Sequence, residues 1–209
     1  MVKEGFIVNL IQALSGFIKE NEFIEPLARG MLLFLEDETV ALERLRVLFG
    51  SDYADIFLLA FDWKLIIPLI PSKTCAWEDL AVSGINAPLY TMPKAVFYVL
   101  QEAMNKGIWD VDMGLKIMFE TLDISVSPNK MVELVEELFN REKFMCVSAR
   151  DIDIACRTVE LPGFADQVIA IFKGVGIISP KLGYLGKLKP GLGPLYDVNP
   201  SLGKKLIDG

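Results

Sequence analysis

Residues 144–198 read FMCVSARDIDIACRTVELPGFADQVIAIFKGVGIISPKLGYLGKLKPGLGPLYDV, and this stretch decides how the chain is expected to fold. Ser148 with Asp151 three residues later forms a capping box, which marks the start of a helix. The segment Leu161-Pro162-Gly163 predicts a sharp turn. The sequence therefore predicts an extended piece at 144–147, a helix from 148 to about 159, a helix from Phe164 to Lys173, and strands at 177–178 and 195–198.

Just upstream, Ser127-Pro128 opens a further helix, which completes a recognisable order of elements. The segment from about Ser127 to Leu202 resembles the winged-helix family, with Val147 to Ile152 resembling the entry to the second helix of that family. The resemblance implies that Phe164 to Lys173 is the third helix and that Lys181 to Gly193 is the wing. It also implies DNA binding as one function to test.

A fainter copy of the same order lies upstream. Ala54-Asp55, Phe61, Ile66-Ile67-Pro68 and Pro88-Leu89-Tyr90 correspond in order to Ala165-Asp166, Phe172, Ile177-Ile178 with Pro180, and Pro194-Leu195-Tyr196. The two series are separated by roughly 106 to 111 residues. We interpret the match as a tandem repeat; the alternative is a single all-helical domain with an irregular tail.

The first half of the chain is mostly helical by the spacing of its apolar residues. Between Phe6 and Ile18 apolar residues recur three and four apart, and this face is expected to pack on its own domain or on a second copy rather than on a membrane. Further helices are expected from about Pro26 to Glu36, from Glu38 to Phe49 and from Asp52 to about Trp63. In the helix 38–49, the residues expected to face inward are Leu42, Leu45, Val47 and Leu48.

The middle of the chain links the two copies. After a short strand at Leu65–Ile67, the stretch Pro71–Pro93 has the composition of a loose hairpin rather than of a helix. Helices then run from Pro93 to a stop at Gly107 and from Asp110 to Leu122. The predicted fold is mainly α, with tandem winged-helix-like units, short β-hairpin wings and linking helices. The predicted domains are 1–92 with an extra leading helix, the linking helices 93–126, and 127–209.

The composition excludes several classes of protein. The 209 residues are 52% hydrophobic, carry a formal net charge of −7 and have a mean hydropathy of +0.39. The absence of histidine excludes Ser-His-Asp and Cys-His catalysis. Asp62, Lys64 and Pro68 interrupt the apolar run from Phe57 to Ile70, so that it falls short of the ~20 residues of a membrane-spanning helix. We therefore expect a cytoplasmic protein.

No constellation of residues points strongly to catalysis or to a metal. Cys75, Cys146 and Cys156 are scattered and lack CxxC spacing, so reduced thiols are expected rather than a disulfide framework or a zinc site. The pairs Asp110/Asp112 and Asp151/Asp153 have the chemistry to hold Mg²⁺, but each lies at a predicted helix start, where a carboxylate caps free N–H groups. The glycines between 183 and 193 lack Walker spacing and fit a flexible wing. We expect no catalytic residue, cofactor or metal.

The charge distribution separates two hypotheses of function. The isoelectric point near 4.8 opposes approach to a nucleic acid, and the predicted third helices carry Asp52, Asp55 and Asp62 in the first copy and Asp166 in the second. Cations gather near the C-terminal wing instead. The residues that would contact nucleic-acid phosphates are Lys173, Lys181, Lys187 and Lys189. The alternative is that these lysines keep a glycine-rich loop in solution.

The hypothesis that we favour from the sequence is a non-enzymatic winged-helix interaction or assembly module. Such a module binds a protein partner, or itself in a homo-oligomer, through apolar surface that remains after folding. The second hypothesis is a DNA-binding transcriptional regulator that contacts phosphates through the C-terminal Lys-rich wing, and the net charge disfavours it. A third, an enzyme that uses carboxylates and a metal, has no supporting residue spacing.

Overall fold

The structure, a computed structural model, describes residues 4–70, 76–81, 84–142, 145–181 and 193–203. The helices are α1 (Glu4–Leu14), α2 (Asn21–Leu32), α3 (Leu42–Phe49), α4 (Tyr53–Asp62), α5 (Trp77–Ala81), α6 (Lys94–Lys106), α7 (Val111–Glu120), α8 (Pro128–Arg141), α9 (Ala149–Thr158) and α10 (Ala165–Val175). The strands are β1 (Thr39–Ala41), β2 (Ile67–Leu69), β3 (Leu89–Thr91), β4 (Cys146–Ser148), β5 (Ile178–Pro180) and β6 (Leu195–Val198). Short 3₁₀ turns are η1 (Leu33–Leu35), η2 (Gly50–Asp52), η3 (Gly84–Asn86) and η4 (Pro200–Leu202).

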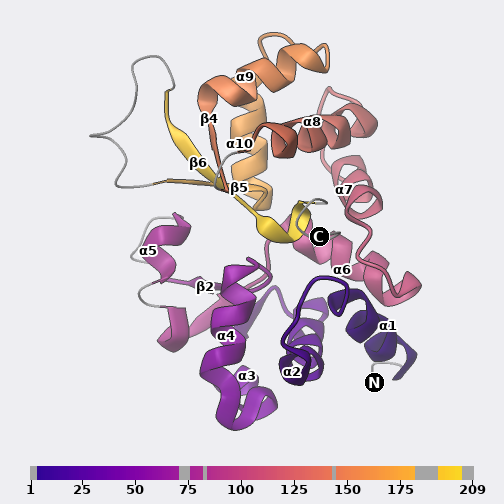
Figure 1. The fold of residues 1–209 in the computed structure, drawn as a ribbon, viewed down its shortest axis with the longest axis vertical. Coiled ribbons are helices and arrows are strands. Elements are labelled where there is room, and N and C mark those ends of the chain that lie inside the picture. The colour runs from indigo at the N-terminus through magenta and orange to yellow at the C-terminus, as the bar shows by residue number, and fades with distance from the viewer. Residues whose placement is uncertain (1–3, 71–75, 82–83, 143–144, 182–192, 204–209) are drawn as a thin grey trace.

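The chain is mainly helical with two small antiparallel sheets, as the sequence predicts. We call α2 to β3 the N-terminal unit and α8 to β6 the C-terminal unit; Figure 1 shows the first below, the second above, and α6 and α7 along one side between them. Both units share the order helix, strand, helix, helix, strand, strand, but in the N-terminal unit the short helix α5 lies between the last two strands. The sheet orders are also the same, β1-β3-β2 and β4-β6-β5. Domain boundaries at 92/93 and 126/127 stay a prediction.

The strand registers of the two units match residue by residue at the predicted repeat. Pro68 in β2 lies opposite Tyr90 in β3, and Pro180 in β5 lies opposite Tyr196 in β6. The residue that begins the helix after the first strand donates its N–H to a proline carbonyl in both units, Leu42 to Pro88 at 3.2 Å and Ala149 to Pro194 at 2.8 Å. The repeated sequence features therefore occupy equivalent places in the two units.

Helix starts and stops follow the local chemistry of the sequence. The hydroxyl of Ser148 accepts from the N–H of Asp151 at 3.1 Å, while the Asp151 carboxylate accepts from the Ser148 N–H at 2.9 Å, which confirms the capping box. Ser127 caps α8, and Asp110 caps α7 by accepting from the N–H of Met113. Gly107 ends α6 in the left-handed conformation.

The helix predicted from Glu38 to Phe49 is wrong at its start. Residues Thr39–Ala41 form β1 and pair with β3, so that α3 begins only at Leu42. The inward orientation predicted for Val47 and Leu48 is also wrong, because their exposed fractions are 83% and 36%. At Thr39–Ala41, pairing with a strand 50 residues further along the chain overrides the helical pattern. At the other end of α3, the apolar side chains of Val47 and Leu48 are in contact with solvent.

Other predicted elements also differ from the structure. The strand predicted at Leu65–Ile67 is found two residues later, at Ile67–Leu69. The second helix begins at Asn21 rather than near Pro26 and contains this proline, after which Leu33–Leu35 continues as a 3₁₀ turn. The stretch between Pro71 and Pro93 is not only a hairpin, since the short helix α5 lies within it. Residues 71–75 lie outside the described part of the chain, and so does the predicted thiol of Cys75.

The linking helices and both units share one hydrophobic core. The leading helix α1 packs on α2 and α6, and Asn9 fastens it by donating to the carbonyl of Met104 at 2.8 Å. Helices α6 and α7 approach so closely at Gly114 that a Cβ there would lie 2.6 Å from the Cα of Val99. The expected packing of the first helix on its own chain is therefore confirmed. Within the described residues, no helix is both long and apolar enough to span a membrane.

Candidate functional site

Asn199 lies in the seam between the two units and is fully buried. Its side-chain amide donates to the carbonyl oxygens of Gly176, at 3.1 Å, and of Lys64, at 3.4 Å. Its side-chain oxygen accepts from the N–H of Ser201 at 3.1 Å and from the Ser201 hydroxyl at 2.8 Å. Since Lys64 belongs to the N-terminal unit and Gly176 follows α10 of the C-terminal unit, this one side chain ties the two units together.

Further contacts across the seam are close and directional. The indole N–H of Trp109 donates to the carbonyl of Ser201 at 2.7 Å, and the backbone N–H of Trp77 donates to the hydroxyl of Ser179 at 3.0 Å. Gly176 ends α10 with a φ of +78°, and a Cβ at this position would lie 2.6 Å from the Cβ of Pro93. Only glycine meets both demands, left-handed backbone and close approach. The units therefore pack in one defined orientation.

Lys181 adds an ionic contact between the units. Its ammonium lies 2.6 Å from a carboxylate oxygen of Asp197 in β6 and 3.4 Å from one of Glu78 in α5. Burial alone lowers the pKa of Lys181, but hydrogen bonds with Asp197 and Cys146 outweigh burial and raise this pKa above its ordinary value. Burial has the opposite effect on the Cys146 thiol, whose pKa it raises because the charged form of a thiol is the deprotonated one. The lysine predicted to reach phosphate thus has carboxylate partners inside the fold.

Lys64 is a second cation at the seam, in more apolar surroundings. Its ammonium donates to the carbonyl of Phe61 at 2.7 Å and lies 3.7 Å from the centre of the Phe61 ring. The indole ring of Trp77 is 5.8 Å away. Burial lowers the pKa of Lys64 to about 8, although Asp62 and Asp197 act in the opposite direction. The ring therefore offsets only part of the cost of burying this charge.

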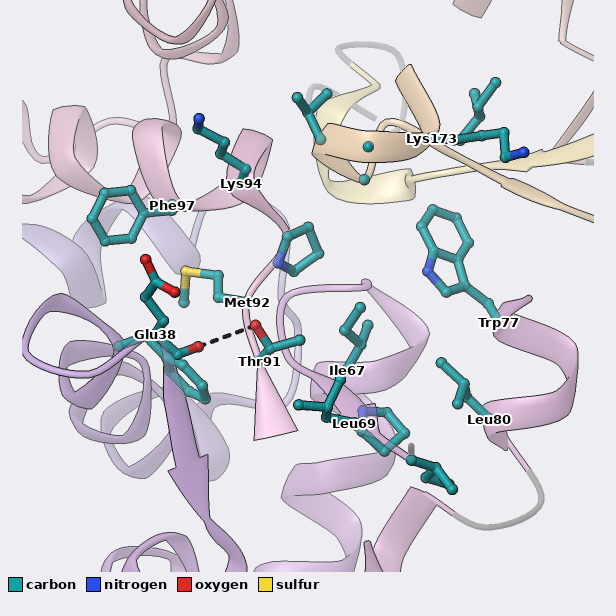
Figure 2. A pocket seen from close by; sticks show the side chains of 18 of the residues that line it. Glu38, Ile67, Leu69, Trp77, Leu80, Thr91, Met92, Lys94, Phe97 and Lys173 are labelled. Atoms are coloured by element: carbon teal, nitrogen blue, oxygen red, sulfur yellow. Dashed lines mark hydrogen bonds between the residues drawn. The ribbon is translucent and has the colours of Figure 1, made fainter. Parts of the chain in front are cut away.

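A groove with a volume of about 710 Å³ opens between the two units, and we call it the inter-unit groove. Figure 2 shows Ile67 and Leu69 of β2 on one side, the end of α10 opposite them, Phe97 of α6 at one end, and Trp77 and Leu80 of α5 at the other. Further lining side chains are Phe34, Ile70, Met92, Tyr98, Val175 and Ile178. The wall is thus largely apolar and is built by both units.

Charged side chains stand at the rim of the inter-unit groove. Lys94 begins α6 and Lys173 lies in the last turn of α10; both are exposed. In the part of the chain that the structure describes, neither lysine makes an ion pair. Glu38 is the one carboxylate among the described lining residues. The rim therefore carries a net positive charge on a chain whose formal net charge is −7.

The outer faces of α4 and α10, which were predicted to be the third helices of the two copies, are not basic. The exposed residues of α4 are Asp55, Leu58 and Asp62, and those of α10 are Asp166, Gln167, Ala170, Lys173 and Gly174. DNA-reading helices need cations that neutralise phosphates beside the groups that read bases. Lys173 alone meets that need here, because α4 offers only carboxylates and an apolar side chain.

Of the four lysines predicted to contact phosphate, the structure describes only Lys173 and Lys181, and these two differ in their surroundings. Lys173 is exposed at the inter-unit groove, whereas Lys181 is half-buried against Asp197. Lys187 and Lys189, with most of the predicted wing, lie outside the described residues. Ile67, Leu69 and Phe97 could not be predicted as binding residues, because no local signal in the sequence distinguishes a groove wall from a core.

The groups with catalytic or metal-binding chemistry have structural roles where they can be seen. Asp110 and Asp151 accept hydrogen bonds at helix starts, which confirms the predicted caps. Cys146 and Cys156 are free thiols. Across the described ranges, no three cysteine, aspartate or glutamate side chains gather as metal ligands would.

Comparison with known proteins gives one match. A protein-family model matches residues 46–208, which begin in α3 and include the C-terminal unit. The matched range contains the inter-unit groove except for Phe34 and Glu38. No curated protein and no solved structure matches the chain.

Proposed function

We propose that this chain, which belongs to the protein family whose model matches residues 46–208, is a non-enzymatic tandem winged-helix module that binds a protein partner. The winged-helix assignment is supported by the order of helices and strands and by the shared sheet order of the two units. The observation that carries the binding function is the inter-unit groove, an apolar recess of about 710 Å³ between the units.

The walls of the inter-unit groove are held in place without a partner. The buried side chain of Asn199 and the close contact of Gly176 with Pro93 fix the orientation of α10 relative to α6. A site that is already formed loses little conformational entropy on binding, so more of the contact energy appears as affinity. Apolar recesses of this kind, rimmed by charged residues, are typical of protein–protein contacts.

Additional apolar surface on the N-terminal unit supports a protein-binding role. Val47 at the end of α3 and Leu58 on the outer face of α4 have exposed fractions of 83% and 46%. In a DNA-binding winged helix this is the face that approaches the duplex, and here it presents Asp55 and Asp62 beside Leu58. Carboxylates at that place repel phosphate.

The first test separates nucleic acid from protein as the partner. Mixed-sequence duplex DNA is titrated with the protein at about 50 mM and about 200 mM salt, and binding is followed by fluorescence anisotropy. We expect no binding in the micromolar range at either salt concentration. Micromolar binding that weakens steeply with salt would overturn the proposal in favour of a DNA-binding regulator.

The second test asks directly for peptide binding. A random peptide library displayed on phage is selected on the immobilised protein, and the selected peptides are then measured against two variants. Leu69→Glu places a charge in the groove wall, and Met113→Glu is the matched control, since the two side chains are exposed at 38% and 39% and Met113 lies outside the groove lining. We expect apolar peptides that bind the wild type and Met113→Glu but not Leu69→Glu. Failure to select any peptide would contradict the proposal.

A further inference from the structure

The strands that line the inter-unit groove are poorly suited to pairing with an added strand. β2 and β5 are edge strands of their sheets, and each contributes a proline to the lining, Pro68 and Pro180. Proline has no N–H to donate, and it protects sheet edges from strand addition. A bound segment therefore has to be held by side-chain packing, as an amphipathic helix is when it lies in an apolar groove.

The opening of the inter-unit groove favours a segment of a macromolecule over a small ligand. Pockets for small ligands enclose most of the surface of the ligand. Here Leu69 is 38% exposed, and Lys94, Lys173 and Gly174 are exposed as well, so that one side of the groove faces solvent. A partner that lies in this groove keeps one face in water, which is the situation of an amphipathic helix.

The charges at the rim indicate which sign of charge the bound segment of the partner carries. Lys94 and Lys173 are exposed and make no ion pair in the described chain, and they stand on different walls, α6 and α10. Lys94 also occupies the first turn of α6, where no side chain caps the free N–H groups. The positive end of this helix adds to the attraction for a carboxylate. Glu38 offsets part of that charge and leaves the rim positive.

We propose that the inter-unit groove binds an amphipathic helix of a partner protein, with apolar residues three and four apart and acidic residues beside them that meet Lys94 and Lys173. This inference rests on the proposed protein-binding function and adds the conformation and charge of the bound segment. The apolar residues contact Ile67, Leu69 and Phe97. The acidic residues supply selectivity, because charge complementarity at the rim of an interface discriminates among partners.

The test is a focused peptide library on a helical scaffold. Anchor positions vary among Leu, Ile, Met and Phe, and flanking positions vary among Glu, Gln and Lys. Selection is carried out on the wild type, on a Lys94→Glu/Lys173→Glu double variant and on Lys19→Glu, which reverses an exposed lysine outside the groove. Circular dichroism establishes that the variants are folded, which we expect since all three side chains are exposed.

We expect the wild type and Lys19→Glu to enrich glutamate at the flanking positions, and the double variant to enrich lysine. Acidic peptides should bind the double variant about 2- to 30-fold more weakly than the wild type, the range for two exposed ion pairs. Peptides that bind without any charge preference, or with a preference that the double variant keeps, overturn the inference and leave the proposed function standing. No enrichment on any protein counts against both.

Two further readouts address conformation and ligand class. Groove-binding peptides from the random library, which has no helical scaffold, should gain helical circular dichroism on binding, and binding of peptides that stay extended contradicts the helical occupant. Dodecanoate is titrated as a small apolar carboxylate that the same lysines and apolar walls would attract. If it binds more tightly than every selected peptide and displaces them, the groove is a small-ligand site and the inference is wrong.

Discussion

Replacing Asn199 by alanine should lower the free energy of unfolding by more than the small size of the asparagine side chain suggests. The substitution deletes two donated hydrogen bonds, to Gly176 and Lys64, and two accepted ones, from the N–H and hydroxyl of Ser201. Ser201 is itself fully buried, so that both of its donors lose their acceptor away from water. A typical hydrogen bond contributes about 1 kcal/mol, and a buried donor left unpaired costs about 1–3 kcal/mol. Because the bond to Lys64 is long at 3.4 Å and contributes little, we expect a loss of about 3 kcal/mol.

The assay is urea unfolding at neutral pH, followed by far-ultraviolet circular dichroism and by tryptophan fluorescence. Two of the three tryptophans, Trp77 and Trp109, donate hydrogen bonds at the seam, so that tryptophan emission is weighted toward the seam while circular dichroism reports on all helices. We expect the two signals to coincide in the wild type and to separate in Asn199→Ala. The matched control is Asn140→Ala on the exposed face of α8, which should change stability by less than about 0.5 kcal/mol. A loss below about 1 kcal/mol for Asn199→Ala, with coincident signals, would refute the role assigned to the seam.

Three further outcomes follow from packing, capping and buried charge. Gly114→Ala should cost about 1–3 kcal/mol in urea unfolding, because the added Cβ meets the backbone of Val99. The control is Gly174→Ala in α10, where the added Cβ meets open space and the change should be neutral or stabilise by up to about 1 kcal/mol. Equal effects of the two substitutions would contradict the close approach of α6 and α7. Ser148→Ala should cost about 1 kcal/mol in thermal or urea unfolding through loss of the capping box, and an unchanged stability would show that the box contributes nothing. The folded-state pKa of Lys64, about 8, lies below the ordinary lysine value of 10.5. The unfolded chain therefore binds more protons between these pH values, and the contribution of Lys64 to stability rises with pH across that window. Relative to Lys64→Met, the wild type should therefore gain up to about 2 kcal/mol between pH 7 and pH 9.5, and a constant difference between the two proteins would contradict this.

The C-terminal unit was the most predictable part of the fold because its signals are local. The capping box at Ser148, the turn at Leu161-Pro162-Gly163 and the strand Leu195–Val198 each depend on residues within a few positions of one another. Their order was enough to predict a mainly helical unit with short strands, as the structure shows. The registry of Pro68 with Tyr90 and of Pro180 with Tyr196 then accounts for the repeat seen in the sequence.

The errors lie where distant contacts decide the outcome. Thr39–Ala41 is too short to show alternation, and its pairing with β3 is invisible in the sequence around it. Val47 is apolar and lies in a helix, and no local pattern in the sequence indicates that its side chain is left exposed. The inter-unit groove depends on contacts such as that of Asn199 with Lys64, which join residues 135 positions apart.

The packing of α1 on α6 bears on the order in which the chain can fold as it is synthesised. The C-terminal unit is a continuous stretch from 128 to 198, so that its contacts are available as soon as that stretch has been made. The leading helix instead waits for Met104, whose carbonyl accepts from Asn9, 95 residues earlier. Until then the apolar face of α1 has no α6 to cover it. Helix α1 thus reaches its final packing only after α6, the helix that leads to the second unit, has been made.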